Sequence, residues 1–283
     1  MLEPRRELPK LTDRYPLGNG LEVGPFCLGL VGEAAIVPAA FEAGINFFFV
    51  SADMHWPLYE QTRRGLELLV KDKPAARDQI VLGLVSYVTQ PEFCWVPFQE
   101  ALEEMPGLGR VDVTIAGGSY GEEIGRRLGI YKQHKDAAYL GVRGTGATFH
   151  DRAAMLPILD EKRVDIAFVR YNPVHAGAAK DLFPNVRDEH PLLFNFKSTF
   201  GHMEEHEYQA VGVGADFWRP HQTDYYRFAL TQPAIDGILC ALPTVGAVRD
   251  LADALAKGPL DEDDHQYLLD LGELARGRAT VKS

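Results

Sequence analysis

Eight short apolar segments recur along this chain at fairly even spacing, and this recurrence constrains the fold more than any other feature. Several of them are continuous rather than alternating, as expected of parallel strands that are buried on both faces. The predicted strands are residues 26–30, 46–50, 80–87, 111–117, 139–144, 164–172, 192–198 and 236–242.

The segments between these strands mix apolar and charged residues at helical spacing. The predicted helices are residues 34–44, 59–70, 97–105, 120–131, 150–162, 223–231 and 245–257, whereas 175–186 is the least helical connection. Eight strand–helix units in 283 residues predict an α/β protein, a (β/α)8 TIM barrel, as one domain over residues 1–283. The competing architecture is an open doubly wound sheet, but no GxGxxG follows an early strand to support it.

Charge and composition exclude several classes of function. The chain has 29 basic and 40 acidic residues, a net charge of -11, so bulk charge does not predict binding to nucleic acid or to an anionic membrane. It has no run of about 18 apolar residues that would span a membrane. Its beginning, MLEPRRELPK, lacks the apolar core of a signal peptide. Three widely spaced cysteines, Cys27, Cys94 and Cys240, are expected to be reduced and mostly buried, as in a cytoplasmic protein.

In a barrel of this type, function lies at the carboxyl ends of the strands. The stretch FFFVSADMHWPLYE (47–60) runs from a buried strand directly into Asp53 and His55. His55 is a candidate acid/base group because an imidazole titrates near neutral pH. Asp53 could orient it, or could instead cap the following turn while Trp56 packs as part of a lid.

Other polar side chains follow the later strands. Tyr87, Ser119 and Tyr171 could line the barrel mouth, since a ring with a polar tip suits both packing and substrate contact. Arg143, Arg170 and Lys197 close three consecutive predicted strands, and the barrel mouth would bring them together.

Three converging cations in an acidic protein need partners, because charged groups are rarely buried unpaired. An anionic substrate such as a carboxylate or phosphate would supply one. Internal salt bridges to Asp53, Asp112 or Asp216 are the alternative, and the sequence does not decide between them.

The longest irregular stretch, residues 201–221, contains HMEEH at 202–206, the spelling of a zinc-protease motif. As a helix it would place His202 and His206 on one face, with His221 or Asp216 as a third ligand. Two histidines in five residues are also common in solvated loops, and no metal is predicted.

Several stretches resemble the aldo-keto reductase superfamily, from about residue 16 to residue 258. They are PLGNGLEVGPFCLGL, AAFEAGINFFFVSAD, YLGVRG, VDIAFVRYNP and QPAIDGILCALPTVGAVRDLADAL. The resemblance implies a barrel whose floor is capped by an N-terminal β-hairpin. It also implies hydride transfer from NADPH, assisted by a tetrad of Asp, Tyr, Lys and His. RYNPVHAGAAKDLFP, TDYYRFALTQPAID and GPLDEDD look most like an atypical bacterial group that lacks this tetrad.

Carried over residue by residue, the tetrad is replaced. The Asp falls on Phe49, the Tyr near Met54, the Lys on Val85 or Ser86, and the His on Ala116 or Gly117. The Ser–Asn pair that would hold the nicotinamide falls on Arg143–Gly144. A Phe cannot lower the pKa of a Tyr, so the standard mechanism is not expected.

The sequence therefore predicts a small-molecule enzyme of specialised metabolism with a remodelled site. His55, Asp53 and Tyr87 would perform acid/base chemistry on an anionic metabolite without standard hydride transfer. The residues predicted to bind that substrate are Arg143, Arg170, Lys197, Tyr171, Trp56 and Ser119. Two alternatives stay open: an NAD(P)H-dependent oxidoreductase with another proton donor, and a non-catalytic ligand-binding or scaffold protein.

Overall fold

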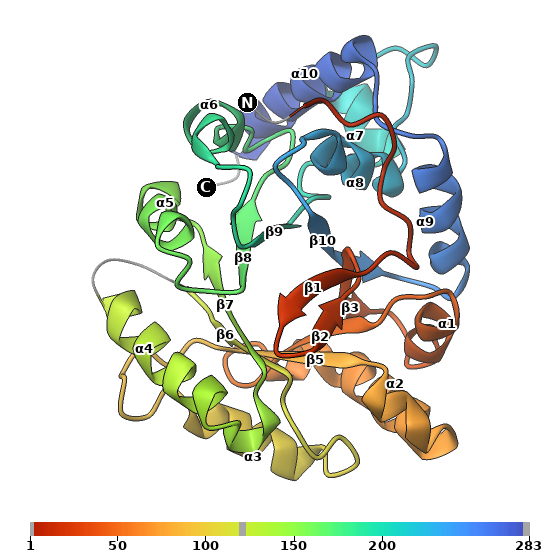
Figure 1. The fold of residues 1–283 in the computed structure, drawn as a ribbon. Coiled ribbons are helices and arrows are strands. Elements are labelled where there is room, and N and C mark those ends of the chain that lie inside the picture. Colours follow the sequence, from red (N-terminus) through yellow and green to blue (C-terminus); the bar gives the residue numbers. More distant parts are fainter. Residues whose placement is uncertain (1–2, 119–122, 280–283) are drawn as a thin grey trace.

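The computed structural model describes residues 3–118 and 123–279. Eight parallel strands close into a barrel in the order β10-β3-β4-β5-β6-β7-β8-β9 (Figure 1). They are β3 (Phe26–Val31), β4 (Phe47–Ser51), β5 (Val81–Ser86), β6 (Val113–Ala116), β7 (Gly144–Phe149), β8 (Ile166–Arg170), β9 (Leu192–Phe196) and β10 (Gly237–Leu242). The predicted (β/α)8 barrel is confirmed.

An antiparallel hairpin, β1 (Tyr15–Gly18) and β2 (Leu21–Val23), precedes the barrel. Its turn contains Asn19 with φ 50° and Gly20 with φ 69°, both left-handed. The hairpin covers the barrel end at which the strands begin, because a Cβ on Gly144 would lie 2.8 Å from Leu17 Cδ2. This end is the floor, so the predicted hairpin cap is confirmed and the mouth is the opposite end.

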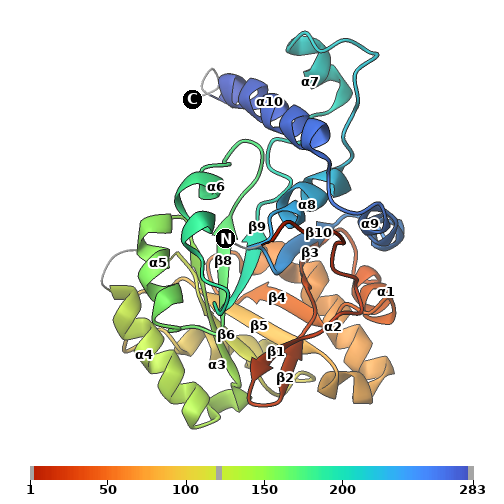
Figure 2. The same cartoon turned by 45° about the horizontal axis from the view of Figure 1, so that its top comes forward.

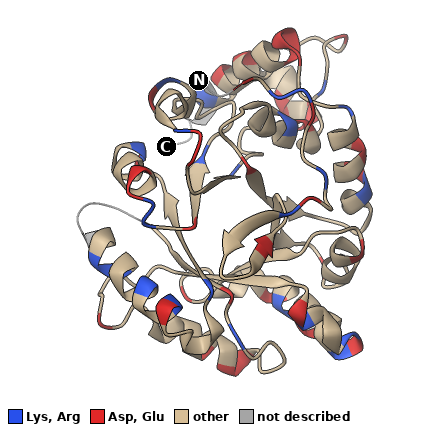
Figure 3. Cartoon of the chain, in the orientation of Figure 1, with Lys and Arg blue, Asp and Glu red and all other residues tan. Residues whose placement is uncertain are grey.

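The outer layer is helical and carries most of the charge, while the barrel strands are nearly free of it (Figure 3). Helix α9 shows why these segments are helical: its buried residues Val248, Leu251 and Leu255 recur at three- and four-residue spacing. The helices are α1 (Ile36–Glu42), α2 (Glu60–Asp72), α3 (Val96–Glu104), α4 (Glu123–Asp136), α5 (Arg152–Asp160), α6 (Ala178–Asp181), α7 (Glu205–Ala210), α8 (Gln222–Thr231), α9 (Gly246–Ala256) and α10 (Glu262–Ala279). Short 3-10 helices are η1 (Trp56–Tyr59), η2 (Pro74–Asp78), η3 (Tyr139–Gly141) and η4 (Phe183–Asn185).

Aromatic rings fill the barrel interior. Phe168 packs against Phe49 and Phe194 with ring centroids 5.6 and 5.7 Å apart, and Phe47 meets Phe194 at 5.8 Å. A glycine makes room for them, since a Cβ on Gly83 would lie 3.0 Å from the Phe47 ring. The barrel is therefore a packed core up to its mouth.

The predicted strand at residues 139–144 is wrong. That segment forms η3, where Leu140 has φ 54° and Gly141 has φ 80°, and the strand follows it as β7, GTGATF. The apolar residues of YLGV led to a strand being predicted one segment too early. The real strand has glycine at two positions where neighbouring side chains fill the space, so it carries no apolar run.

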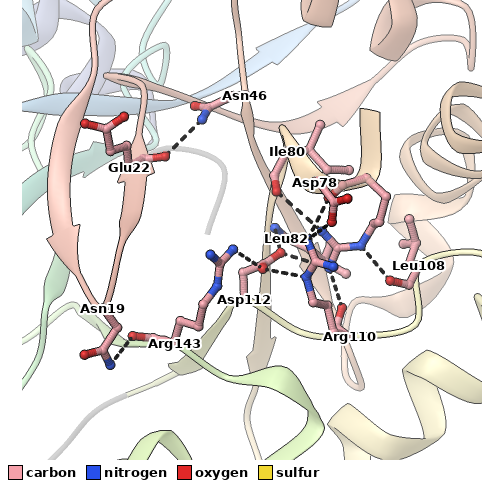
Figure 4. Close-up of polar contacts among 11 residues, drawn as sticks. Asn19, Glu22, Asn46, Asp78, Ile80, Leu82, Leu108, Arg110, Asp112 and Arg143 are labelled. Atoms are coloured by element: carbon pink, nitrogen blue, oxygen red, sulfur yellow. Dashed lines mark hydrogen bonds and ion pairs between the residues drawn. The ribbon is translucent and has the colours of Figure 1, made fainter. Parts of the chain in front are cut away.

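This correction moves Arg143 to the floor. Arg143 precedes β7, and its carbonyl accepts a hydrogen bond from Asn19 Nδ2 in the hairpin turn at 3.3 Å (Figure 4). Its guanidinium pairs with the fully buried Asp112 at 2.7 Å. For Arg143, the internal salt bridge is the correct alternative.

Asp112 joins several elements at the floor (Figure 4). Besides Arg143, it pairs with Arg77 at 2.9 Å and Arg110 at 3.2 Å, and it accepts the Leu82 N–H at 2.9 Å. One buried carboxylate thus ties η2 to the starts of β5, β6 and β7.

A second, small core lies away from the hairpin, between α7 and α10 (Figure 2). It consists of the buried side chains Met203, Tyr208 and Leu271, separate from the main core. A neighbouring face of α10 packs on the segment after β8, where a side chain at Gly272 would clash with Pro173. None of the helices within residues 3–118 and 123–279 is long and apolar enough to cross a membrane.

Candidate active site

A cavity of about 410 Å³ opens at the barrel mouth. A volume of this size suits a small-molecule ligand. Its walls come from the ends of five strands, β3, β4, β7, β9 and β10, and from the segments after β4, β5 and β9. The lining residues are Gly29, Leu30, Phe49, His55, Leu58, Tyr59, Tyr87, Thr148, His150, Phe196, Lys197, Ser198, Thr199, Tyr226, Leu239, Cys240 and Ala241.

His55 and Tyr87 form one wall of the cavity. Their rings meet edge to face, with centroids 5.1 Å apart. The His55 amide donates to Ser51 Oγ at 3.3 Å, which fixes the start of the loop. Tyr87 lies over Gly117, where a Cβ would be 2.8 Å from its ring. The missing side chain at residue 117 therefore creates the space that Tyr87 occupies.

Asp53 supports this wall from behind. Its Oδ2 accepts hydrogen bonds from the Tyr87 amide at 2.7 Å and Ser86 Oγ at 2.8 Å, and its Oδ1 accepts from the Met54 amide at 2.6 Å. These contacts tie the loop after β4 to the end of β5. They fit the capping role, and none of the Asp53 hydrogen bonds among the described residues goes to His55.

Tyr59 is a candidate that the sequence did not single out. It begins the turn into α2, is almost fully buried, and packs on Phe49 with ring centroids 6.1 Å apart. Burial raises the pKa of its phenol well above the usual range, and the nearby Tyr87 adds to this. Tyr59 is therefore a neutral hydrogen-bond donor in the lining of the cavity.

The opposite wall is basic. Lys197 follows β9 with φ 56°, and Arg170 ends β8, which pairs with β9. Arg170 is two residues beyond the inward-facing Phe168 and so points to the barrel interior. Neither cation makes an ion pair or side-chain hydrogen bond with any residue in the described part of the chain.

His150 completes this wall. It packs edge to face on Phe196, with centroids 5.1 Å apart. Burial lowers the pKa of His150, and the positive charges of Arg170 and Lys197 lower it further. The pKa of His175 is lowered by burial and by the same two cations among others, so four basic groups gather around the ends of β7, β8 and β9.

Several predicted site residues lie elsewhere. Arg143 is at the floor, and its prediction as a substrate-binding residue at the mouth is wrong. Tyr171 is fully buried outside the cavity, stacked on Phe228 with centroids 5.1 Å apart and edge-on to Phe183. Trp56 lies beside the mouth but outside the lining, with the Arg63 guanidinium 3.7 Å above its ring. Ser119 falls outside the described residues.

The structure thus brings His55, Tyr87 and Lys197 together in one cavity, with Arg170 and Asp53 next to it. Thr148 and His150 were missed because the strand before them was misplaced. The signal that could have found them is the rule that polar residues follow strands, applied to GTGATFH instead of YLGVRG.

HMEEH does not lie within one helix, because α7 begins only at Glu205 and His202 precedes it. Within the described ranges, no three His, Cys, Asp or Glu side chains are grouped so that they could hold a metal ion.

The nicotinamide cofactor implied by the resemblance fits this chain only in part. The cavity has room for a ring beside Thr148, whose hydroxyl accepts the Gly118 N–H at 3.2 Å. At the start of α9, residues 243–248 contain no Lys or Arg, and Arg249 is the first cation of the helix, so a phosphate there would meet backbone N–H groups with Arg249 one position further on. Phe49, where the Asp of the resemblance falls, is buried among other rings.

Comparisons with known proteins place the fold. No protein-family description matches the sequence, and no curated protein matches it. Solved structures do match. The holo form of aldo-keto reductase AKR11C1 from Bacillus halodurans superposes with a TM-score of 0.68 at 13% identity, covering 92% of this chain and 96% of that one. An aldo/keto reductase from Brucella melitensis gives 0.63 at 14% identity, covering 92% and 99%.

A thermostable aldo-keto reductase solved with the inhibitor epalrestat gives a TM-score of 0.66 at 15% identity, covering 92% of this chain and 99% of that one. Identities this low carry a likeness of fold and nothing finer. This chain has the barrel fold of the aldo-keto reductases.

Proposed function

We propose that this protein is a small-molecule enzyme that moves a proton on an anionic substrate, with His55 as the acid/base group. The observation that carries the proposal is the pairing of His55 with Tyr87 in a cavity whose opposite wall bears Lys197 without an acidic partner among the described residues. The chemistry would be elimination, isomerisation or cyclisation without hydride transfer.

The two walls would divide the work. Removing a proton next to a carboxylate or carbonyl places negative charge on oxygen, which Lys197 would stabilise. The His55 imidazole would take the proton and return it at a second position. The Tyr59 hydroxyl would donate a hydrogen bond to the substrate from the cavity wall.

Proton exchange with solvent tests this proposal and does not require the product to be identified. The protein is incubated in D₂O with a panel of oxo acids and unsaturated acids, and loss of carbon-bound proton signals is followed by NMR. Wild type should exchange at least one class of acid, and His55→Gln should lower the rate by about 10²–10⁴-fold. Equal exchange rates in the two proteins would refute the acid/base role of His55. No exchange by wild type would refute the proposal that the protein moves a proton on these acids.

Reduction is the second candidate. Two observations favour it. The cavity extends along the ends of β3, β9 and β10, and the structural neighbours are named as reductases. Tryptophan fluorescence, to which Trp56 beside the mouth contributes, would report titration with NADPH and NADH. Saturable micromolar binding would support the reductase, and none at millimolar cofactor would end it.

A further inference from the structure

The mouth cavity is chemically divided. One side, at the ends of β7 and β9, is polar and carries Thr148, His150 and Lys197, across from the wall of His55 and Tyr87. Its other side is apolar and comes from β3, β10 and η1, with Leu30, Leu58 and Leu239.

The basic side needs a negative partner. Lys197 lines the cavity, Arg170 ends the neighbouring strand, and no carboxylate among the side chains that the structure describes pairs with either. Charges left so close together in a partly buried site favour a bound anion. His150 and Lys197 line the cavity together, and the positive charges of Lys197 and Arg170 both lower the pKa of His150, so all three groups belong to the same side of the mouth.

The apolar side continues past the cavity to the surface. Leu30 is 38% exposed and Leu58 is 64% exposed, although both line the cavity. Met54, 67% exposed, precedes Leu58 in the segment after β4. Large apolar side chains left in water at the rim of a cavity favour a ligand that covers them.

We infer that the substrate of this site is an amphipathic acid: a compound with one anionic head group and an apolar body. The head would lie between Lys197, Arg170 and His150, and the body would run along Leu30 and Leu58 to the surface. A small polar dianion would leave the leucines exposed, and an uncharged apolar compound would leave the cations unpaired. The inference rests on the proposed function for the choice of cavity and adds the class of substrate.

Calorimetric titration with a series of simple ligands tests both halves. The ligands are butanoate, hexanoate and octanoate, compared with octanol, octylammonium and glutarate. Affinity should rise about fourfold per added methylene across the carboxylates. Octanoate should bind at least about tenfold more tightly than octanol, octylammonium or glutarate. Equal binding of octanoate and octylammonium would overturn the head-group site, and equal binding of butanoate and octanoate would overturn the apolar track.

Matched variants assign the two ends. Lys197→Met keeps the side-chain length and should weaken octanoate by about tenfold while leaving octanol unchanged. Arg170→Gln should act in the same direction. Leu58→Asn should reduce the gain per methylene and keep the preference for a carboxylate. Lys71→Met and Leu68→Asn, both on α2, are the controls and should bind as wild type. Circular dichroism confirms that each variant is folded.

These titrations need no turnover, so they separate this inference from the proposed function. Normal carboxylate binding with no His55-dependent exchange would refute only the acid/base role. His55-dependent exchange without any preference for apolar carboxylates would refute only the amphipathic acid.

Discussion

At the scale of single residues, the site depends on two residues that support Tyr87 from outside the cavity. Gly117 leaves the space that the Tyr87 ring fills, and Asp53 holds the Tyr87 amide. His55 then meets the ring that these two residues have fixed. Preorganisation of the wall is therefore encoded at positions that the substrate does not touch.

Gly117→Ala tests the first support. The new Cβ would lie 2.8 Å from the Tyr87 ring and 2.9 Å from Val85 Cγ2, so the ring must move. We expect octanoate affinity and proton exchange to fall about tenfold, with the loss of stability limited to about 1–3 kcal/mol. Gly129→Ala is the control, because nothing lies within 4 Å of its Cβ position, and it should be neutral or slightly stabilising. Wild-type binding by Gly117→Ala would show that Tyr87 is held by other contacts.

Asp53→Ala tests the second support. The carboxylate accepts three hydrogen bonds, so we expect the free energy of unfolding in urea to fall by about 1–3 kcal/mol. Asp53→Asn retains one acceptor oxygen and should lose less. If Asp53 instead orients His55, Asp53→Asn would shift the pH profile of proton exchange at nearly unchanged stability.

Sequence reasoning found His55, Tyr87 and Lys197 because each follows an apolar strand within a few residues. It missed His150 because β7 has glycines where an apolar pattern would need side chains. It placed Tyr171 in the mouth because this residue directly follows β8. The Tyr171 side chain instead packs against Phe228 of α8. Which side a residue faces at the last position of a strand depends on packing against helices such as α8, which the local sequence does not contain.

At the scale of elements, the barrel is fastened at its floor by one buried carboxylate. Asp112 bridges the arginines that precede β5, β6 and β7. The sequence contained Asp112 and Arg143 as one possible pair among three. Whether Arg143 lies at the floor or at the mouth depends on where β7 begins. The closed barrel shows that β7 begins after Arg143, which places Arg143 at the floor.

Asp112→Asn removes the negative charge and leaves Arg77, Arg110 and Arg143 close together. Breaking a buried ion pair from one side costs about 3–5 kcal/mol, and we expect a loss of this size in urea unfolding. Asp78→Asn is the matched control: the Asp78 side chain is 82% exposed and pairs with Arg110, so its loss should cost less than about 1 kcal/mol. Similar losses in the two variants would show that the floor network contributes no more than a surface pair.

At the scale of the whole molecule, burial of histidines makes stability depend on pH. The pKa values of five histidines are lowered in the folded protein, chiefly by burial: His134, His150, His175, His202 and His265. The unfolded chain therefore binds more protons than the folded one near the ordinary histidine pKa of 6.5.

It follows that stability rises with pH through this range. The contribution of the neutral histidines is present above about pH 6.5 and is lost as the pH falls below it. We expect the urea midpoint to fall between about pH 7.5 and pH 5.5 at fixed moderate salt, which screens the net charge of -11. A midpoint that stays constant or rises on acidification would contradict the lowered pKa values.

The small core between α7 and α10 has a consequence for motion. The buried core at α7 consists of three side chains, far fewer than in the barrel, so we expect this helix to open as a local unit without global unfolding. Its amide protons should exchange with deuterated solvent well before those of β4 or β8, as mass spectrometry of peptides would show. The chain that leads to α7 leaves the cavity wall at Thr199, so each such opening also loosens one edge of the mouth and gives a bulky ligand a way in.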